Sequence, residues 1–341
     1  MITLGIETSC DETSVSVTNG KKVLANVVTS SVKLHKKYGG VVPEIASRYH
    51  VEYIIEVLHD ALSKSGKSLK DVDLISVTNG PGLVGALLIG ISLAKSLSLS
   101  LDVPLIGVNH ILAHLYSAFL NEPSERPRFP FIGLVVSGGH TALFYCEDFD
   151  RQLLLGQTQD DAVGEAFDKV AKILSLGYPG GPVIERRARL ASKKDGIVFP
   201  KSYLGKESLD FSFSGIKTAV LYRVQKLRNA QAAISGTEVN EICYAFQEAA
   251  LDVIVDKAIL AGKRYNVHSI VVGGGVAANK RLRGKFEAVY KSHGVRAYFP
   301  VFTHCMDNAA MIGYLGEELY KKGFRSDLFL SAEPNLEVVN C

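Results

Sequence analysis

Residues 2–17 read ITLGIETSCDETSVSV, and their pattern of apolar and polar residues indicates the fold class. Apolar residues dominate positions 2–7, and apolar and polar residues alternate at positions 13–17, which predicts two strands. The short polar run at positions 8–12 predicts a tight turn between them. The stretch is therefore expected to form an antiparallel hairpin whose tip carries hydroxyl groups and two carboxylates.

The second half of the chain repeats this pattern. Residues 131–145 read FIGLVVSGGHTALFY, again a strand, a small-residue turn and a strand. A buried strand that leads into a glycine-rich turn and then a helix also occurs twice. The two strands end at about residues 78 and 272. Self-similarity of this kind predicts an internally duplicated α/β core.

The spacing of matched glycines locates an insertion. Gly133 follows Gly5 by 128 positions, whereas Gly273 follows Gly80 by 193 positions. The second copy should therefore contain roughly 65 additional residues. The segment at about 155–240 has a mostly helical pattern and is the expected insertion.

The duplication predicts two α/β lobes around a nucleotide cleft. Residues 1–108 are expected to form the first lobe, and residues 109–307 the second lobe with its insertion. A helix at about 308–325 should pack back on the first lobe. The length of 341 residues agrees with two domains.

The composition indicates an ordinary folded protein. Hydrophobic residues make up 47% and charged residues 21%, which excludes a disordered chain. The formal net charge of +3 permits an acidic partner such as RNA without requiring one.

The expected localisation is cytoplasmic. The five cysteines are odd in number and form no Cys-x-x-Cys pair, which indicates free thiols in a reducing compartment. Residues 1–3 lead directly into a strand without a secretory signal pattern. The most apolar run, residues 83–101, is interrupted by Lys95 and by serines and glycines, so no membrane span is expected.

A pair of histidines stands at the start of a predicted helix. His110 and His114 are four positions apart and would lie on one helix face, where one metal ion can reach both. Two histidines of a helix surface or core would give the same spacing.

A third metal ligand must come from elsewhere in the chain. Asp307 is favoured over Asp11, Asp160 and Asp161, because it stands at a helix start after a strand and a turn; His304 is the competitor. Two histidines and one carboxylate suit Fe²⁺ or Zn²⁺, and the absence of thiolate ligands slightly favours iron.

Two other functions are consistent with parts of this pattern. Metallopeptidases of the zincin type use His-Glu-x-x-His with the glutamate as base, and here Ile111 occupies that position. A non-catalytic, nucleotide-dependent scaffold of the same fold would need the cleft but not the histidine pair.

The glycine turns are suited to phosphate groups. Backbone N–H groups in such turns bind phosphate without side chains, and no Walker sequence is present. Three basic runs, residues 33–37, 185–194 and 280–285, either contact RNA or are solvated faces. His35 and Tyr38 are the candidates for base stacking in the first run.

The motifs together resemble the TsaD family, also known as Gcp, YgjD or O-sialoglycoprotein endopeptidase. The resemblance runs in order from about residue 2 to residue 320. It rests on residues 5–13 (GIETSCDET), 109–114 (NHILAH), 136–141 (VSGGHT), 164–169 (GEAFDK), 178–182 (YPGGP) and 273–279 (GGGVAAN).

The resemblance implies the fold of actin-like ATPases, sugar kinases and Hsp70. It also implies transfer of the threonylcarbamoyl group from threonylcarbamoyl-AMP to N6 of adenosine 37 in tRNAs that read ANN codons, giving t6A and AMP. Bacterial members of the family work with the TsaB and TsaE proteins, so this chain is expected to be inactive alone. The tail beyond Ser326, including Cys341, matches no motif.

Site residues carry over to the matching positions. His110, His114 and Asp307 would bind one metal ion, expected to be iron. The chemistry of the reaction, and not a carried-over role, names Glu12 or Asp11 as the group that removes the proton from the adenine amine, and the sequence does not decide between them. The adenylate would contact Val136, Ser137, Gly138, Gly139, His140, Asp168, Gly181 and Asn279.

Overall fold

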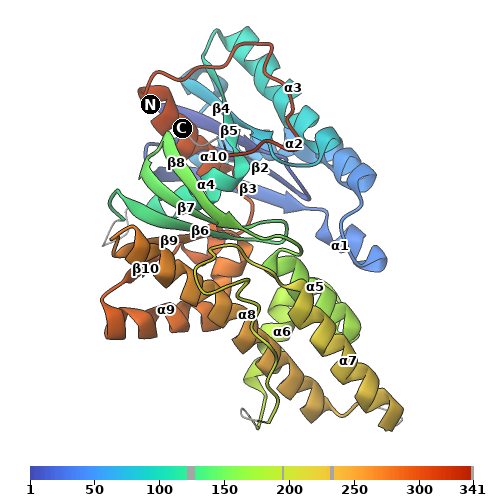
Figure 1. Ribbon diagram of the computed structural model, residues 1–341. Coiled ribbons are helices and arrows are strands. Elements are labelled where there is room, and N and C mark those ends of the chain that lie inside the picture. The colour runs from blue at the N-terminus through green and yellow to red at the C-terminus, as the bar shows by residue number, and fades with distance from the viewer. Residues whose placement is uncertain (121–126, 194–195, 231–233, 339–341) are drawn as a thin grey trace. The chain divides into compact units, whose positions relative to one another are not determined.

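The structure is a computed structural model that describes residues 1–120, 127–193, 196–230 and 234–338 (Figure 1). The chain divides into two compact units. Unit 1 comprises residues 1–127, 147–152 and 300–341, and unit 2 comprises residues 128–146 and 153–299. The expected boundary at residue 108 differs from this division, because residues 109–120 and Asp307 belong to unit 1.

Unit 1 contains a five-stranded sheet in the order β3-β2-β1-β4-β5. β1 pairs antiparallel with β2 and parallel with β4, and β4 pairs parallel with β5. The predicted hairpin of residues 2–17 is therefore present. The strands are β1 (Ile2–Glu7), β2 (Glu12–Asn19), β3 (Lys22–Ser30), β4 (Leu74–Gly80) and β5 (Leu105–Asn109).

Unit 2 contains a second five-stranded sheet with the matching order β8-β7-β6-β9-β10. β6 pairs antiparallel with β7 and parallel with β9, as β1 does with β2 and β4. The same topology in both sheets confirms the predicted duplication. The strands are β6 (Phe131–Val136), β7 (Thr141–Asp148), β8 (Arg151–Gln157), β9 (Ser269–Gly273) and β10 (Arg296–Tyr298).

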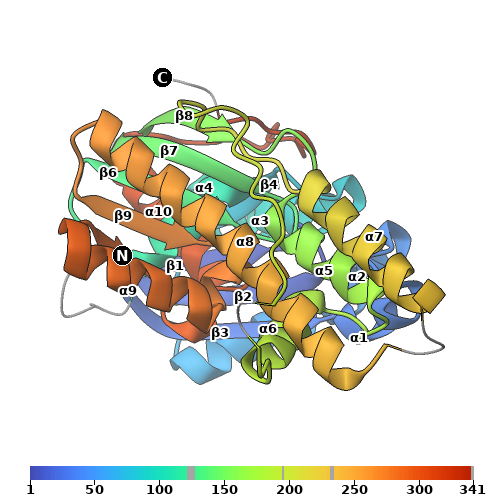
Figure 2. The same ribbon diagram turned by 60° about the horizontal axis from the view of Figure 1, so that its bottom comes forward.

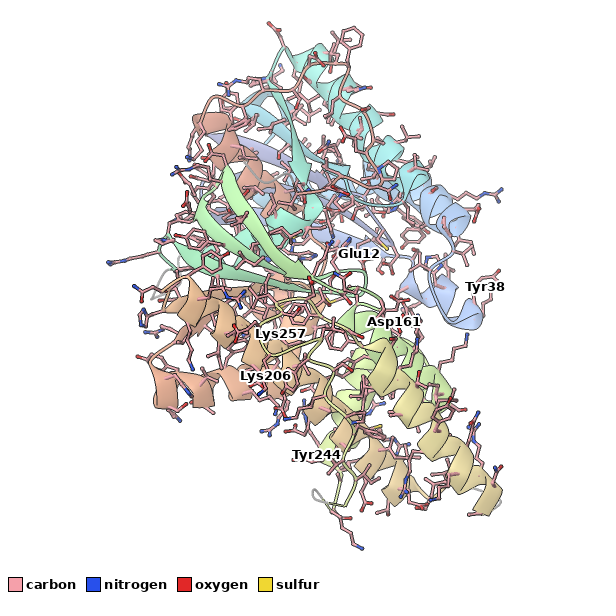
Figure 3. The ribbon with its side chains drawn as sticks, in the orientation of Figure 1. Glu12, Tyr38, Asp161, Lys206, Tyr244 and Lys257 are labelled. Carbon is pink, nitrogen blue, oxygen red and sulfur yellow. The ribbon has the colours of Figure 1, made fainter. Side chains whose placement is uncertain are left out.

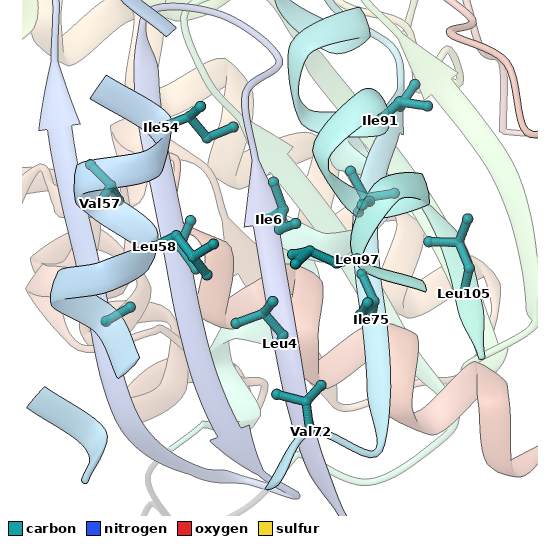
Figure 4. Packing of buried hydrophobic residues seen from close by; sticks show 14 of the residues in the cluster. Leu4, Ile6, Ile54, Val57, Leu58, Val72, Ile75, Ile91, Leu97 and Leu105 are labelled. Atoms are coloured by element: carbon teal, nitrogen blue, oxygen red, sulfur yellow. The ribbon is translucent and has the colours of Figure 1, made fainter. Parts of the chain in front are cut away.

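Alternation along β1 places helices on both faces of the first sheet. Leu4 and Ile6 are fully buried in a core formed with α2 and α3 (Figure 4). Gly5, between them, faces α10, where an added Cβ would lie 2.3 Å from the Ala309 carbonyl oxygen. Only glycine permits this approach of helix and strand. The helices of unit 1 are α1 (Val32–His35), α2 (Pro43–Ser65), α3 (Val84–Leu101), α4 (His110–Tyr116) and α10 (Ala309–Lys321).

The expected insertion is helical. Between β8 and β9 the described residues form four helices, and Figure 2 shows α8 lying between α7 and α9. The helices of unit 2 are α5 (Val163–Ile173), α6 (Gly180–Arg189), α7 (Ser214–Ala230), α8 (Gly236–Arg264) and α9 (Lys280–His293). Short 3-10 helices lie at η1 (Lys36–Tyr38), η2 (Leu69–Asp71), η3 (Ser117–Phe119), η4 (Gly275–Ala278) and η5 (Phe302–His304).

Helix α3 is the one helix within the described ranges that is long and apolar enough to cross a membrane. A core helix of a folded domain has the same length and composition, and α3 buries Leu87, Ile91 and Ala94 in the unit 1 core. The four cysteines in the described ranges, Cys10, Cys146, Cys243 and Cys305, are free thiols, as expected; Cys341 lies outside those ranges.

Candidate metal centre and nucleotide-binding loop

Helix α4 carries the two histidines, and Asn109 is the N-cap that makes the helix begin at His110. The Asn109 side-chain oxygen accepts hydrogen bonds from the backbone N–H groups of Ile111 (2.9 Å) and Leu112 (3.2 Å), as a helix N-cap does. His110 and His114 then lie one turn apart on one face. Their ring centroids are 4.7 Å apart, and both side chains are buried.

Asp307 reaches the same point from the turn before α10. Its Oδ1 lies 3.1 Å from His114 Nε2 and 3.7 Å from His110 Nε2. One ligand atom from each of the three residues lies within 4.8 Å of the other two. Two ligands of a tetrahedral zinc-type site are separated by about 3.4 Å, so these distances fit a metal ion. The three residues form a possible metal-binding triad.

The environment of His114 supports the fit. Both of its ring nitrogens are buried, and within the described part of the chain neither has a hydrogen-bond partner. A buried polar atom is nearly always hydrogen-bonded, because water otherwise solvates it better. A nitrogen that instead donates its lone pair to a metal ion satisfies this requirement.

Glu7 completes this centre, and the sequence analysis did not assign it a role. Its Oε2 lies 3.0 Å from His110 Nδ1, and its carboxylate also accepts hydrogen bonds from Thr78 Oγ1 (2.6 Å) and the Ser9 N–H (2.5 Å). A carboxylate on Nδ1 orients the ring so that Nε2 faces the metal position. Glu7 lies 103 positions before His110, so local patterns could not reveal the contact.

The Glu7–His110 pair changes the pKa of both groups. Burial opposes the charge on Glu7, but the positive charge of His110 and their hydrogen bond outweigh it and hold the Glu7 pKa below its ordinary value. Burial likewise opposes the charge on His110, but Glu7 and Asp307 raise its pKa. The two carboxylates therefore make this pocket strongly attractive to a cation.

Glu12, one of the two expected proton acceptors, begins β2 in the same unit (Figure 3). The Ser30 hydroxyl donates to its Oε1 at 3.1 Å. Burial, followed by the negative charges of Asp307 and Asp11, raises the Glu12 pKa well above its ordinary value. A carboxyl group with a raised pKa is better matched to proton transfer near neutral pH.

His110, His114 and Asp307 all lie in unit 1. The reason is that the chain from Pro300 onward returns to unit 1 and brings Asp307 with it. Asp160 and Asp161, the rejected alternatives, lie in unit 2. Asp160 accepts hydrogen bonds from Ser212 and Ser214, and Asp161 pairs with two lysines.

The unit 2 loop that follows β6 forms a closed turn. The Ser137 N–H donates to the His140 carbonyl oxygen (2.8 Å), and the His140 N–H donates to Ser137 Oγ (3.0 Å). Val136 ends the strand and is buried, whereas Gly138 and Gly139 are exposed. The tip of the loop is thus bare backbone, which is the form that suits an anionic ligand.

The described protein atoms do not crowd Gly138 or Gly181. An added Cβ at either position meets no atom within 4 Å. The crowded glycines are their neighbours: a Cβ on Gly164 would lie 2.5 Å from the Ser137 oxygen, and one on Gly274 2.4 Å from the Val136 oxygen. These glycines let α5 and the β9 turn pack directly on the loop.

Asp168 and Asn279 are held by their own hydrogen bonds. Asp168 Oδ1 accepts from the Gly180 N–H at 2.5 Å, which connects α5 to the start of α6 beside Gly181. Asn279 caps α9, and its amide donates to Gln247 Oε1 at 3.1 Å. These hydrogen bonds hold the side chains of Asp168 and Asn279 in a fixed orientation.

A pocket of about 330 Å³ adjoins Asn279. Glu185 Oε1 at its edge accepts from the Lys280 N–H at 3.1 Å and pairs with Arg189 at 2.5 Å. Sequence reasoning treated Glu185 only as part of a basic run and missed this placement. The pocket is lined by Glu185, Ala188, Arg189, Tyr244 (Figure 3), Gln247, Lys280 and Arg281.

The structure revises the basic runs. His35 is fully buried, so it cannot stack on a base, whereas Tyr38 is 53% exposed. Arg281 and Lys285 are paired with Glu248, which lowers the positive potential of the third run. Lys194 of the second run lies outside the described residues.

Comparisons with known proteins agree with the motifs. Residues 22–314 match the TsaD family, described as tRNA N6-adenosine threonylcarbamoyltransferase. A protein of that name from Dictyoglomus turgidum is 51% identical over 337 residues, covering 98% of each chain.

Solved structures show the same fold. Full-length HypF in its phosphate- and nucleotide-bound form has a TM-score of 0.62 at 14% identity, covering 94% of this chain and 55% of HypF. The activator of 2-hydroxyisocaproyl-CoA dehydratase from Clostridium difficile, with bound ADPNP, has a TM-score of 0.51 at 14% identity, covering 95% and 97%. The chain therefore has the actin-like α/β fold and belongs to the TsaD family of tRNA N6-adenosine threonylcarbamoyltransferases.

Proposed function

We propose that this transferase moves the threonylcarbamoyl group from threonylcarbamoyl-AMP to N6 of adenosine 37 in tRNAs that read ANN codons, giving t6A and AMP. The observation that carries the proposal is the triad of His110, His114 and Asp307, oriented by Glu7, in a chain of this family. The fold alone would not carry it, because the same fold serves several functions.

The reaction exchanges one bond for another. The N6 amine attacks the carbamoyl carbon, an N–C bond forms, the C–O bond to the phosphate breaks, and AMP leaves. The amine must lose one proton, and Glu12 or Asp11 accepts it in this proposal. The raised pKa of Glu12 favours Glu12 for this role.

The metal proposed for the triad is Fe²⁺, with Zn²⁺ as the alternative. Its chemistry there would be to stabilise negative charge on the leaving phosphate or the carbamoyl oxygen. The protein's own contribution is the fixed direction of the His110 ring through Glu7 and the dry surroundings of His114.

The adenylate is proposed to bind unit 2. The exposed N–H groups at Gly138 and Gly139 offer donors to phosphate oxygens. The other proposed contacts are Asp168 in the middle of α5, Gly181 in the first turn of α6 and Asn279 at the N-cap of α9. The open space at Gly138 and Gly181 leaves room for a ligand there.

Partners and localisation belong to the same proposal. We expect TsaB and TsaE to be required and the enzyme to act in the cytoplasm. Exposed apolar side chains on α2 and α3, which pack side by side, support a protein partner on unit 1. These side chains are Val51, Ile55, Val84 and Leu88. A non-catalytic scaffold remains the alternative, and it would not need the triad.

Replacement of His114 by alanine tests the proposal. The purified chain is combined with TsaB, TsaE, threonylcarbamoyl-AMP and tRNA, and t6A is measured by nucleoside mass spectrometry beside metal content. Loss of one of three ligands should lower both metal occupancy and t6A formation by at least tenfold while folding is retained. His293→Ala, an exposed histidine of α9, is the control and should change neither.

Two outcomes would overturn the proposal. Full t6A formation by His114→Ala protein without bound metal would remove the triad from the reaction. Metal-dependent peptide cleavage by the wild-type chain, without t6A formation, would support the metallopeptidase function instead.

A further inference from the structure

The turn between β1 and β2 is held from outside the hairpin at three consecutive carbonyl groups. The Leu83 N–H donates to the Ser9 oxygen at 2.8 Å. His50 Nε2 lies 3.0 Å from the Cys10 oxygen. The Asp11 oxygen accepts from both the N–H (2.9 Å) and the hydroxyl (3.0 Å) of Ser31. A turn with ordinary solvent-facing carbonyls would have none of these bonds.

His50 spans Asp11, the last residue of the turn, and Glu12, the first residue of β2. It lies on α2, is fully buried, and contacts Cys10 with one nitrogen and Thr13 with the other. A carbonyl oxygen only accepts, so Nε2 carries the hydrogen, and Nδ1 accepts from the Thr13 hydroxyl at 2.7 Å. The ring therefore bridges the residues on either side of Asp11 and Glu12.

A second histidine reaches the same turn by way of Ser31. The Val42 N–H donates to His35 Nδ1 at 3.3 Å, which leaves the hydrogen on Nε2. His35 Nε2 lies 2.9 Å from Ser31 Oγ, and that hydroxyl donates to the Asp11 oxygen. In all three hydrogen bonds the donor is on the side of Val42 and the acceptor on the side of Asp11, so the chain of donors leads from Val42 through His35 and Ser31 to the turn.

We infer that His50 is a positioning residue for Glu12 and Asp11, and that His35 and Ser31 form a second arm with the same effect. This inference rests on the proposed function, in which one of these acids receives the amine proton. Both arms require a neutral imidazole with its hydrogen on Nε2. Burial lowers the His50 pKa, which keeps that ring neutral.

An ordinary pair of buried core histidines would have partners scattered over the fold. Here two histidines from α1 and α2 both act on the backbone of the four-residue turn between β1 and β2, which carries Asp11 and leads directly into Glu12 at the start of β2. Displacement of a catalytic group by about 1 Å can reduce a rate up to a hundredfold. The contacts are therefore expected to affect the rate more than substrate binding.

The test compares His50→Leu, His50→Gln and the control His59→Leu, which alters an exposed histidine of the same helix. The leucine removes both hydrogen bonds, whereas the glutamine amide can donate to Cys10 and accept from Thr13. We expect His50→Leu to lower kcat for t6A formation at least tenfold, with KM for tRNA and for threonylcarbamoyl-AMP changed less than threefold. His50→Gln should recover most of the rate.

Metal content is measured in each variant and should stay at the wild-type level, since His50 does not touch the triad. Where His50→Leu does not fold, Thr13→Val, which removes one of the two bonds at nearly constant volume, takes its place and should lower kcat alone. Unchanged kcat in folded His50→Leu and Thr13→Val proteins would overturn the inference. So would a His50→Gln protein as slow as His50→Leu. An inactive wild type would instead overturn the proposed function.

Discussion

At the scale of single residues, the two kinds of glycine around the β6 loop should respond differently to substitution. Gly138→Val adds a side chain into open space, so the free energy of unfolding should change little, while adenylate binding should weaken by about 1–3 kcal/mol. Gly164→Val drives a side chain into the Ser137 backbone and should destabilise unit 2. Calorimetric titration with a threonylcarbamoyl-AMP analogue and thermal unfolding separate the two. Unchanged affinity in folded Gly138→Val protein would contradict this role of the loop.

Asp161 illustrates a charge that stabilises the fold instead of the site. Its carboxylate joins α5 and α7 through Lys169 Nζ (2.5 Å) and Lys217 Nζ (2.6 Å). Burial opposes its charge, but these lysines outweigh burial and hold the Asp161 pKa below its ordinary value. The stabilisation is complete above the unfolded pKa of about 4 and is lost as pH falls through the lower folded pKa.

Asp161→Asn should therefore lower the free energy of unfolding by about 1–3 kcal/mol at pH 7, and the difference from wild type should shrink below pH 4. Asp60→Asn is the control, because the Asp60–Lys64 pair at 3.5 Å is exposed and contributes little. Urea unfolding at pH 7, 5 and 3 checks this. A difference that stays constant over this range would contradict the role of the charge.

At the scale of secondary-structure elements, the C-terminal tail, residues 326–338, packs along the sheet of unit 1 (Figure 1). β5 is an edge strand. Along it, the Ser326 N–H donates to the Leu105 oxygen at 2.9 Å, and the Gly107 N–H donates to Ser326 Oγ at 3.0 Å. Further on, the Glu333 N–H donates to the Asn79 oxygen at 2.8 Å. Leu330 packs against the core between these points. The tail therefore covers an edge that would otherwise be open to pairing with other chains.

A chain that ends at Asp327 should lose these later contacts. We expect the free energy of unfolding of unit 1 to fall by about 2 kcal/mol or more. The truncation removes Leu330 and two backbone hydrogen bonds, from the Glu333 N–H to the Asn79 oxygen and from the Gly82 N–H to the Pro334 oxygen. Aggregation on heating should increase. The control ends at Val338 and keeps every described contact of the tail. Equal melting temperatures of the two truncated chains, measured by calorimetry, would count against this role.

At the scale of the whole molecule, activity is expected to depend on partner proteins. The chain alone, with threonylcarbamoyl-AMP and tRNA, should form little t6A, and addition of TsaB and TsaE should restore it. Ile55→Glu places a charge on the exposed apolar surface of α2 and α3 and should weaken TsaB binding at least tenfold without loss of metal. Leu190→Glu, an equally exposed leucine in unit 2, is the control. Undiminished TsaB binding by Ile55→Glu protein would exclude this surface.

The duplicated core and the histidine pair could be predicted from the amino-acid sequence. Strand periodicity, glycine turns and the four-residue spacing of His110 and His114 are local properties, because each depends on residues that are neighbours in one element. The fold class follows, since a strand–turn–strand pattern that occurs twice in order leaves few ways to build two sheets.

The full set of residues around the metal centre became known only from the packing of distant elements. Glu7 meets His110 across 103 positions, and Asp307 belongs to unit 1 because the last part of the chain returns there. Likewise, His35, expected at a surface, is buried against Ser31, and the tail without any motif lies along β5. Such contacts depend on how distant elements pack and on their register. The free energy of that packing is shared by the whole core, so no local pattern encodes it.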